Sequence, residues 1–305
     1  MLIAALDFGS NSLKCLFAEI TPEGISYGQD IRLITRLGSA LDEQGNISTQ
    51  AIQNSVAAVN TIIKDLPLQT KVIAVGTEAL RKAANNAEFV RAIWKECGIE
   101  LKIISADEES KLAWLGVLSG LPDKNEDILL FDSGGASTEI IHGMNGKILQ
   151  SVSLPIGAVN LHGRFVHSDP ISNYDLQQLS HAISHSLNIP FFTSAKLFAT
   201  GGGVLACAKV ALQNDKLTSV DLDGFQLTMV QLKAEIEMYK TLNITERKQI
   251  PGMEAERADI ILCSAMLYHA IMQACSVEVL TVSSRGVRHG LLHQCKPGVD
   301  FTFDY

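Results

Sequence analysis

The sequence predicts an α/β fold made of two related halves, and three observations lead to this prediction. Short apolar strands alternate with helical segments along the 305 residues. A unit of strand, tight turn and returning strand occurs near the start and again from residue 127. These two units are too far apart for a short-period repeat protein, so the recurrence suggests duplication of a larger structural unit.

The first half opens with a buried strand, IAALDF, which is followed by the turn GSNS and a second strand, LKCLFAEI. Apolar periodicity and helix-start residues then predict an alternating series: a helix over about 48–64, a strand over 71–75, a helix over 88–96, a strand over 101–104 and a helix over about 107–118. This alternation is typical of an α/β domain.

The second half repeats the opening unit as the strand DILLF, the turn DSGGAS and the start of a strand, TEII. The elements predicted after it are a helix over 174–187, a strand over 196–200, a helix over 204–212, a long apolar helix over 256–274, a strand over 277–282 and a helix over 286–294. Pro, Asp, Lys and Asn cluster in LPDKNED, so we place the domain boundary there. The predicted domains are 1–122 and 123–287, and the C-terminal helix, about 288–305, is expected to pack back on the first.

Composition limits the function classes. With 47% hydrophobic residues the chain can bury a substantial core. A net charge of −8 argues against coating nucleic acid or an anionic membrane, because such proteins carry basic surfaces. The six cysteines are scattered without CxxC spacing, and no apolar stretch is long enough to cross a bilayer. We therefore expect a cytoplasmic protein with reduced thiols.

Three turns that follow predicted strands are rich in Gly, Ser or Thr: GSNS at 9–12, SGGAS at 133–137 and TGGG at 200–203. Such turns let backbone N–H groups approach an anion, and hydroxyl groups add neutral donors. Taken alone, each is explained as well by a tight structural turn. Because there are three, and two share the pattern D-x-G, they favour a common phosphate site.

If such a site also hydrolyses a bound phosphate compound, it needs a carboxylate that activates water, and usually a divalent cation. Asp7 and Asp132 stand where strands end, and Glu139 shares a strand face with Ser137. The acids at 107–109 open a predicted helix, where capping and the helix dipole alone explain at least two of them. Arg81 is the clearest cation of the first half, and its alternative is an exposed helix face.

Seven segments together resemble the exopolyphosphatase and guanosine pentaphosphate phosphohydrolase (Ppx/GppA) family of the actin, Hsp70 and sugar-kinase superfamily. They are LDFGSNSLK near the start, GTEALRKAANNAEF at 76–89, IISADEESKLAWLGV at 103–117, FDSGGASTEI at 131–140, SLPIGAVNL at 153–161, PGMEAERADII at 251–261 and VSSRGVRHGLL at 282–292. The resemblance covers nearly the whole chain.

The resemblance implies two ribonuclease H-like domains with an interdomain cleft as the active site. It also implies roles for particular residues. Glu109 matches the catalytic glutamate; Ser10, Asn11, Ser12, Arg81, Gly134, Gly135, Ser137, Gly201 and Gly202 match phosphate-binding positions; Asp132 and Glu139, with Asp7, match metal-associated positions. The implied cofactor is Mg²⁺, or another divalent cation such as Mn²⁺, which would offset repulsion between carboxylates and phosphates.

The leading hypothesis is therefore a hydrolase that releases terminal phosphate from polyphosphate, from guanosine pentaphosphate, or from both. The chain departs from the family pattern at Lys14, Ala136, Ser284 and His289. The departures at Ala136, Ser284 and His289 motivate a second hypothesis, a non-catalytic sensor that binds an alarmone or polyphosphate, although the retained Glu109 argues against it. A sugar or acetate kinase on the same fold is a third. The sequence isolates no guanine pocket, and a homodimer is expected only by resemblance to the family.

Overall fold

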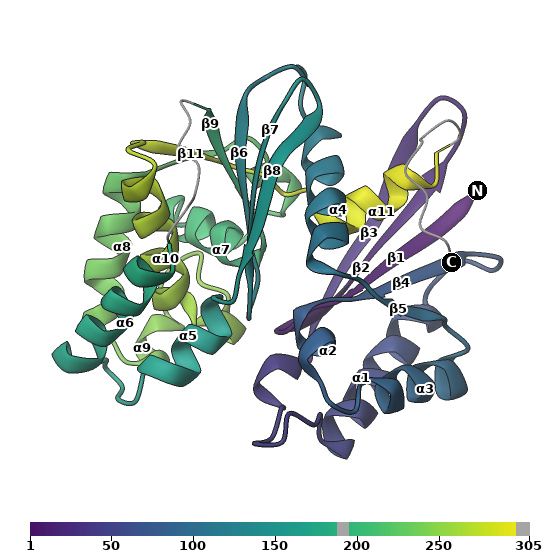
Figure 1. Ribbon diagram of the computed structural model, residues 1–305, viewed down its shortest axis with the longest axis horizontal. Coiled ribbons are helices and arrows are strands. Elements are labelled where there is room, and N and C mark those ends of the chain that lie inside the picture. The colour runs from purple at the N-terminus through teal and green to yellow at the C-terminus, as the bar shows by residue number, and fades with distance from the viewer. Residues whose placement is uncertain (188–194, 297–305) are drawn as a thin grey trace. The chain divides into compact units, whose positions relative to one another are not determined.

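The computed structural model describes residues 1–187 and 195–296 of the chain (Figure 1). The chain divides into two compact units. Unit 1 comprises Met1–Gly120 and Arg285–Tyr305, and unit 2 comprises Leu121–Ser284. The sequence predicts domain boundaries at 122/123 and 287/288, and the two compact units meet at 120/121 and 284/285. The end of the predicted C-terminal helix, 297–305, lies outside the described residues.

Unit 1 contains a five-stranded sheet in the order β3-β2-β1-β4-β5. Its strands are β1 (Leu2–Phe8), β2 (Ser12–Ile20), β3 (Ile25–Ile34), β4 (Lys71–Gly76) and β5 (Leu101–Ile103). The first three form an antiparallel meander, whereas β4 pairs parallel with β1 and β5 pairs parallel with β4. The carboxyl ends of β1, β4 and β5 therefore meet at one edge of the sheet.

Helices cover both faces of this sheet (Figure 1). They are α1 (Thr49–Lys64), α2 (Glu78–Lys82), α3 (Asn86–Cys97), α4 (Ala106–Leu118) and α11 (Val287–Gln294), with a short 3₁₀ turn η1 (Leu37–Ser39). One face packs Leu6 and Phe8 against Phe89 and Ile93 of α3. Side chains alternate along a strand, so Asp7 points to the other face, on which α11 packs against β1 and β2.

Unit 2 contains a six-stranded sheet in the order β10-β11-β9-β6-β7-β8. Its strands are β6 (Ile128–Ser133), β7 (Thr138–Met144), β8 (Lys147–Leu154), β9 (Lys196–Thr200), β10 (Gln226–Thr228) and β11 (Val279–Val282). Here β6, β7 and β8 form an antiparallel meander, and β9 and β11 continue in parallel from β6. This is the strand order of unit 1 with β10 added, as the repeated strand-turn-strand unit predicts.

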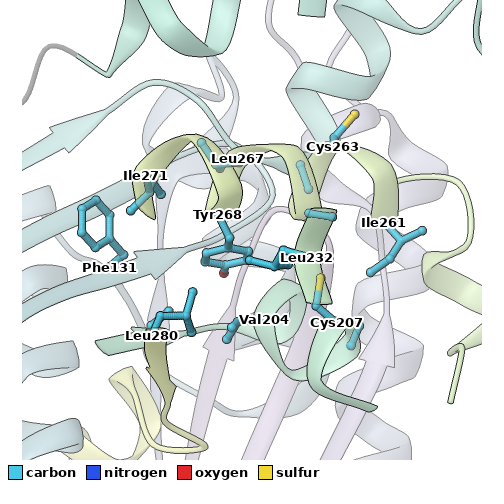
Figure 2. Packing of buried hydrophobic residues seen from close by; sticks show 14 of the residues in the cluster. Phe131, Val204, Cys207, Leu232, Ile261, Cys263, Leu267, Tyr268, Ile271 and Leu280 are labelled. Carbon is cyan, nitrogen blue, oxygen red and sulfur yellow. The ribbon is translucent and has the colours of Figure 1, made fainter. Parts of the chain in front are cut away.

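The helices of unit 2 are α5 (Ala158–Phe165), α6 (Asn173–Ser186), α7 (Gly202–Ala211), α8 (Met229–Thr241), α9 (Ile244–Arg247) and α10 (Ile261–Ala274), with 3₁₀ turns η2 (Val220–Leu222) and η3 (Ala255–Arg257). One cluster of buried side chains joins these helices to the sheet. Figure 2 shows Tyr268 of α10 at its centre, above Val204 of α7 and Leu280 of β11. The glycine turn before α7 is thus anchored on a dense apolar core.

The long helix predicted over 256–274 is shorter in the structure. The chain makes the 3₁₀ turn η3 first, and α10 begins only at Ile261. Arg257 explains the difference. Its buried side chain pairs with Glu254 and lies against Gly202, and the backbone around it forms the 3₁₀ turn and not an α-helix. None of the helices in the described part of the chain has the length and hydropathy needed to span a bilayer.

Candidate functional site

The turn after β1 lies at the carboxyl edge of the unit 1 sheet. The Gly9 N–H donates to the carbonyl of Ser12 at 3.1 Å and closes the turn. The chain after β3 then wraps around it: Gly38 donates to the carbonyl of Ser10 at 2.7 Å, and Arg36 donates to that of Asn11 at 3.0 Å. Ser10, Asn11 and Ser12 are consequently held in fixed positions and are almost fully buried.

Two polar atoms of this turn are buried without a hydrogen-bond partner in the structure: Asp7 Oδ1 and Asn11 Nδ2. The other carboxylate oxygen of Asp7 pairs with the Lys14 ammonium at 3.5 Å. An unpaired buried polar group costs about 1–3 kcal/mol. A carboxylate oxygen is a ligand for a hard cation, and an amide N–H donates to a phosphate oxygen. The two atoms therefore fit the predicted metal and phosphate.

Glu109 lies in the first turn of α4 and is buried. Its carboxylate accepts a hydrogen bond from Nη1 of Arg81 at 2.6 Å. Arg81 comes from α2, directly after β4, and its guanidinium also donates to the Ile104 carbonyl and to Glu78. Residues that follow β1, β4 and β5 thus gather at the carboxyl edge where these parallel strands end, the usual position of ligand sites in α/β sheets.

The three acids at the start of α4 have different environments. Glu108 forms a capping box with Ser105, each side chain bonding the other's backbone N–H, and Asp107 is exposed and pairs with Lys111. Capping and surface charge therefore account for these two, as the sequence predicted for at least two of the three. Glu109 differs, because it turns inward to Arg81.

The ion pairs of Arg81 fix its charge. Burial by itself lowers the Arg81 pKa, but the carboxylates of Glu109 and Glu78 outweigh this effect and raise the pKa above its ordinary value. Arg81 therefore lies within a partly buried ion-pair network and not on the exposed helix face considered as its alternative. Its predicted contact with phosphate stays a prediction.

In unit 2, the turn Gly134–Ser137 joins β6 to β7 and packs on the start of α5. The carbonyls of Gly134 and Gly135 accept from the backbone N–H groups of residues 158–160, and that of Ala136 accepts from the Asn160 side chain. In a trans peptide the next N–H points opposite to the carbonyl. The N–H groups of residues 135–137 therefore face away from α5, as an anion-binding turn requires.

Asp132 and Glu139 are directly opposite each other on β6 and β7. Glu139 is buried and accepts from the Ser153 hydroxyl at 2.8 Å. Two like charges in this position destabilise a sheet unless something compensates them, and a divalent cation would do so. The described residues contain no group of three or more His, Cys, Asp or Glu side chains placed to hold a metal alone. Mg²⁺ usually takes only one or two carboxylates and completes its shell with water and phosphate oxygens, so the pair fits this ion.

The glycine turn after β9 needs its glycines. Gly201 has φ of 107°, and a Cβ there would lie 2.4 Å from the Ser133 carbonyl oxygen. A Cβ on Gly202 would lie 1.8 Å from Nη2 of Arg257. Arg257 is therefore a buried cation against a predicted phosphate turn, and the sequence analysis did not select it. Its only signal in the sequence is a charged residue next to an apolar helix.

The departures from the family pattern have local structural roles. Ala136 has no positive φ, so its methyl group adds no backbone strain. Ser284 donates through its N–H and its hydroxyl to Asp223. His289 is the third residue of α11, and its Nδ1 accepts a hydrogen bond from the N–H of the N-cap residue Gly286 at 3.4 Å. Burial, with nearby Arg288, Arg285 and His293, holds the His289 pKa well below its usual value, so the ring stays neutral.

Comparison with known proteins agrees with this geometry. The model of the Ppx/GppA phosphatase family matches residues 18–297. Exopolyphosphatase 1 of Mycobacterium bovis is 26% identical over 304 residues, which cover 96% of this chain and 87% of that protein. The Aquifex aeolicus Ppx/GppA enzyme is 27% identical with a TM-score of 0.81, covering 96% of this chain and 98% of that one. An exopolyphosphatase from Cytophaga hutchinsonii, 24% identical, has the same fold, with a TM-score of 0.90 and coverage of 98% and 99%.

The two sheets of equal strand order, each with a turn suited to phosphate, define a protein of the two-domain actin-like class. Within that class, the chain belongs to the Ppx/GppA phosphatase family, because the family model spans most of its length.

Proposed function

We propose that this protein is an exopolyphosphatase that releases terminal phosphate from inorganic polyphosphate by metal-assisted attack of water. The observation that carries the proposal is the combination, in unit 1, of the buried Glu109 carboxylate held by Arg81 with the unpaired atoms of Asp7 and Asn11. The name of the Mycobacterium bovis relative supports polyphosphate as the substrate.

Each part of the site has a role in this proposal. In unit 1, the turn at Ser10–Ser12 would bind phosphate oxygens. In unit 2, the N–H groups of residues 135–137 would do so, and the Gly201–Gly202 turn would add further backbone donors. Glu109 accepts a proton from the attacking water, and Arg81 fixes the orientation of its carboxylate. In unit 2, Asp132 and Glu139 would hold Mg²⁺, which would supply positive charge to the phosphate oxygens. In unit 1, Asp7 is a separate candidate ligand for such a cation.

The test is phosphate release from polyphosphate by purified protein in the presence of Mg²⁺. Glu109→Gln keeps the size of the side chain and one hydrogen-bond acceptor for Arg81, but it is not a base. We expect a fall of kcat by about a hundredfold or more, because general-base catalysis contributes about 10²–10⁴. Glu108→Gln is the matched control: it alters the capping box with Ser105 and the ion pair with Lys102 but not the contact with Arg81, so it should stay near the wild-type rate. Full activity of Glu109→Gln would reject the assigned base.

We further propose guanosine pentaphosphate as a second substrate, since it also ends in a phosphoanhydride. Assaying both compounds under the same conditions decides between them. Tight binding of either compound by calorimetry, with no turnover under Mg²⁺ or Mn²⁺, would instead support the sensor hypothesis. Six free cysteines, three of them buried, support the proposal of a reducing, cytoplasmic location.

A further inference from the structure

A buried tyrosine, Tyr268 of α10, connects two of the predicted phosphate turns of unit 2. Figure 2 shows its ring among apolar side chains, with the hydroxyl oxygen in red. The residue is 1% exposed, and its hydroxyl donates a hydrogen bond to the Thr200 carbonyl at 3.3 Å. Thr200 ends β9 and directly precedes Gly201, so this bond holds the chain where the glycine turn begins.

The same hydroxyl also reaches the other turn. The Ser133 side chain forms a hydrogen bond with Tyr268, and Ser133 is the last residue of β6, directly before Gly134. A tyrosine hydroxyl has one proton to donate, and its oxygen can also accept. Because that proton goes to the Thr200 carbonyl, the Ser133 hydroxyl donates to the Tyr268 oxygen. Burial raises the pKa of Tyr268 well above its ordinary value, so the hydroxyl keeps its proton and remains a donor.

A further hydroxyl fixes the other end of the Gly134–Ser137 turn. Thr138 directly follows this turn, is fully buried, and donates to the Ile156 carbonyl at 2.7 Å, just before α5 begins. Its oxygen also lies 3.2 Å from the Ser133 hydroxyl oxygen. The hydroxyls of Ser133, Thr138 and Tyr268 therefore form one buried network, which ties both ends of the turn to neighbouring helices.

The two turns are in backbone contact, and α10 packs against one of them. A Cβ on Gly201 would lie 2.4 Å from the Ser133 carbonyl oxygen, so no side chain fits between the turns. A Cβ on Gly203, at the start of α7, would lie 2.9 Å from Ser264 Oγ and 3.4 Å from Tyr268 Cε2. The turns and this face of α10 are therefore packed so closely that a displacement of Tyr268 would reach both turns.

The hydroxyl of Tyr268 has a cost that packing alone does not explain. Burying a hydroxyl in an apolar core is unfavourable unless hydrogen bonds compensate it, and phenylalanine would fill the same space without this requirement. Both bonds of the Tyr268 hydroxyl go to the last residue of a strand that leads into a predicted phosphate turn. Tyr239, equally buried in the same core, instead donates to Glu235 of its own helix. The bonds of Tyr268 thus join two strand ends, whereas that of Tyr239 joins one helix to itself.

We propose that Tyr268 is a positioning residue for phosphate binding in unit 2. Through its bonds to Ser133 and Thr200, its hydroxyl keeps the Gly134–Ser137 turn and the turn after β9 in a fixed relation, so that backbone N–H groups of both can bind one phosphate ligand. The inference rests on the proposed function for the identity of that ligand. Donors that are already in place bind an anion without the cost of ordering them.

The experiment compares Tyr268→Phe, which removes only the hydroxyl, with the matched control Tyr239→Phe, which removes an equally buried one. Hydrogen–deuterium exchange of the ligand-free proteins gives the exchange rates of backbone N–H groups in peptides covering 133–138 and 200–204. We expect Tyr268→Phe to speed exchange in both peptides about two- to tenfold, the effect of losing one neutral hydrogen bond. Tyr239→Phe should speed exchange in neither.

Binding of inorganic polyphosphate is measured by calorimetry in the Glu109→Gln background, and phosphate release gives KM and kcat in the wild-type background. Tyr268→Phe should raise Kd and KM about two- to tenfold. It should change kcat less, because the proposed base, Glu109, belongs to unit 1. Ser133→Ala should have a similar effect, and the double variant should lose less than the sum of the two, because both hydroxyls act in one network.

The proposal is overturned if exchange in either turn is unchanged in Tyr268→Phe, or if both turns exchange faster while Kd and KM stay at the wild-type values. Equal losses of affinity in Tyr268→Phe and Tyr239→Phe would also overturn it, because they would show a general effect of a weakened core. If the wild-type protein binds polyphosphate, with the affinity lowered only in Tyr268→Phe, but releases no phosphate, the proposed function fails and the positioning role stands. If the wild-type protein does not bind polyphosphate at all, both are rejected.

Discussion

Asp7 is buried in the folded state at a cost in free energy. Its Oδ1 atom is buried without a partner, and its Oδ2 atom forms a single ion pair with a partly exposed lysine. A carboxylate removed from water in this way is stabilised less than it was in solvent. Such a residue is expected where a ligand supplies the missing interaction.

Asp7→Asn tests this at a single side chain. The substitution preserves the shape but removes the buried charge, so we expect the melting temperature to stay the same or rise. Phosphate release should fall at least tenfold, because the amide is a poor ligand for Mg²⁺. Thermal melting and a phosphate-release assay measure the two effects. Asp65→Asn, at an exposed helix end, should change neither. Loss of stability together with full activity would show that Asp7 is only structural.

The sequence pattern identified the three candidate phosphate turns. Without the family resemblance, it could not show which of the acids at 107–109 is the catalytic candidate. Glu108 and Glu109 are neighbours of the same type, and only their direction separates them. Successive helix residues point about 100° apart. Glu108 therefore reaches back to Ser105 while Glu109 turns to Arg81, which comes from a different element. Arg257 was missed for a related reason, since its contact with Gly202 depends on the tertiary structure.

Among the elements, α4 and α11 pack unusually closely. A Cβ on Gly116 of α4 would lie 2.1 Å from the Gly286 carbonyl oxygen, and one on Gly290 of α11 would lie 2.1 Å from that of Leu112. Backbone therefore meets backbone at both points, and no flexible side chain can move aside. Since α4 also carries Glu109, this packing fixes the helix that positions the proposed base.

Gly116→Ala should destabilise the protein by about 1–3 kcal/mol, the usual cost of overpacking, although alanine is the better helix former. Gly163→Ala in α5 is the matched control: a Cβ there meets nothing within 4 Å, so helix propensity alone should stabilise by about 0.5–1 kcal/mol. Urea unfolding of the two variants gives the comparison. Equal effects of the same sign would contradict the close packing.

Most of the predicted elements agree with the structure, but several were not predicted, including the strands β3, β8 and β10 and the helices α5 and α8. The strands β3 and β8 lie at the edge of a sheet, so much of their length is exposed and neither has a buried apolar run. They are positioned by hydrogen bonds to β2 and β7, which no local pattern records. The central strands β1 and β6 are apolar and buried, and the sequence pattern is sufficient for them.

At the scale of the molecule, one buried acid should make stability depend on pH. Glu235 of α8 lies in the core of unit 2 beside Tyr239, whose hydroxyl donates to it at 3.0 Å, and beside Cys207. Burial raises the Glu235 pKa to about 8, although hydrogen bonds from Tyr239 and Cys207 act in the opposite direction. The folded state therefore holds a proton on Glu235 that the unfolded chain releases at lower pH.

The sign follows from proton linkage. A raised carboxyl pKa means that the folded state binds more protons, so this residue makes stability fall as pH rises from about 4.5 to about 8. The slope is at most about 1.4 kcal/mol per pH unit. Glu235→Gln, which is neutral at all pH values, should remove this contribution. Urea unfolding of both proteins between pH 5 and pH 8 measures it, and parallel pH profiles would contradict the assignment.

The division of the chain leads to another prediction at this scale. Unit 2 is one continuous segment, Leu121–Ser284, whereas unit 1 needs both Met1–Gly120 and the segment from Arg285. A fragment of residues 121–284 should therefore unfold cooperatively, since all of its core is present. A fragment of residues 1–120 lacks α11 and leaves the Gly116 side of α4 uncovered, so it should bind a hydrophobic dye and melt without a sharp transition.

The close contact between α4 and α11 also sets the order in which the two units can fold during synthesis on the ribosome. The residues of α4 are translated before unit 2, and α11, the helix that covers them, is translated after it. Until then the nascent chain exposes a surface shaped for backbone contact, on the same helix as Glu109. Unit 2 can fold first, and the helix that holds Glu109 reaches its final packing only after α11 has been translated.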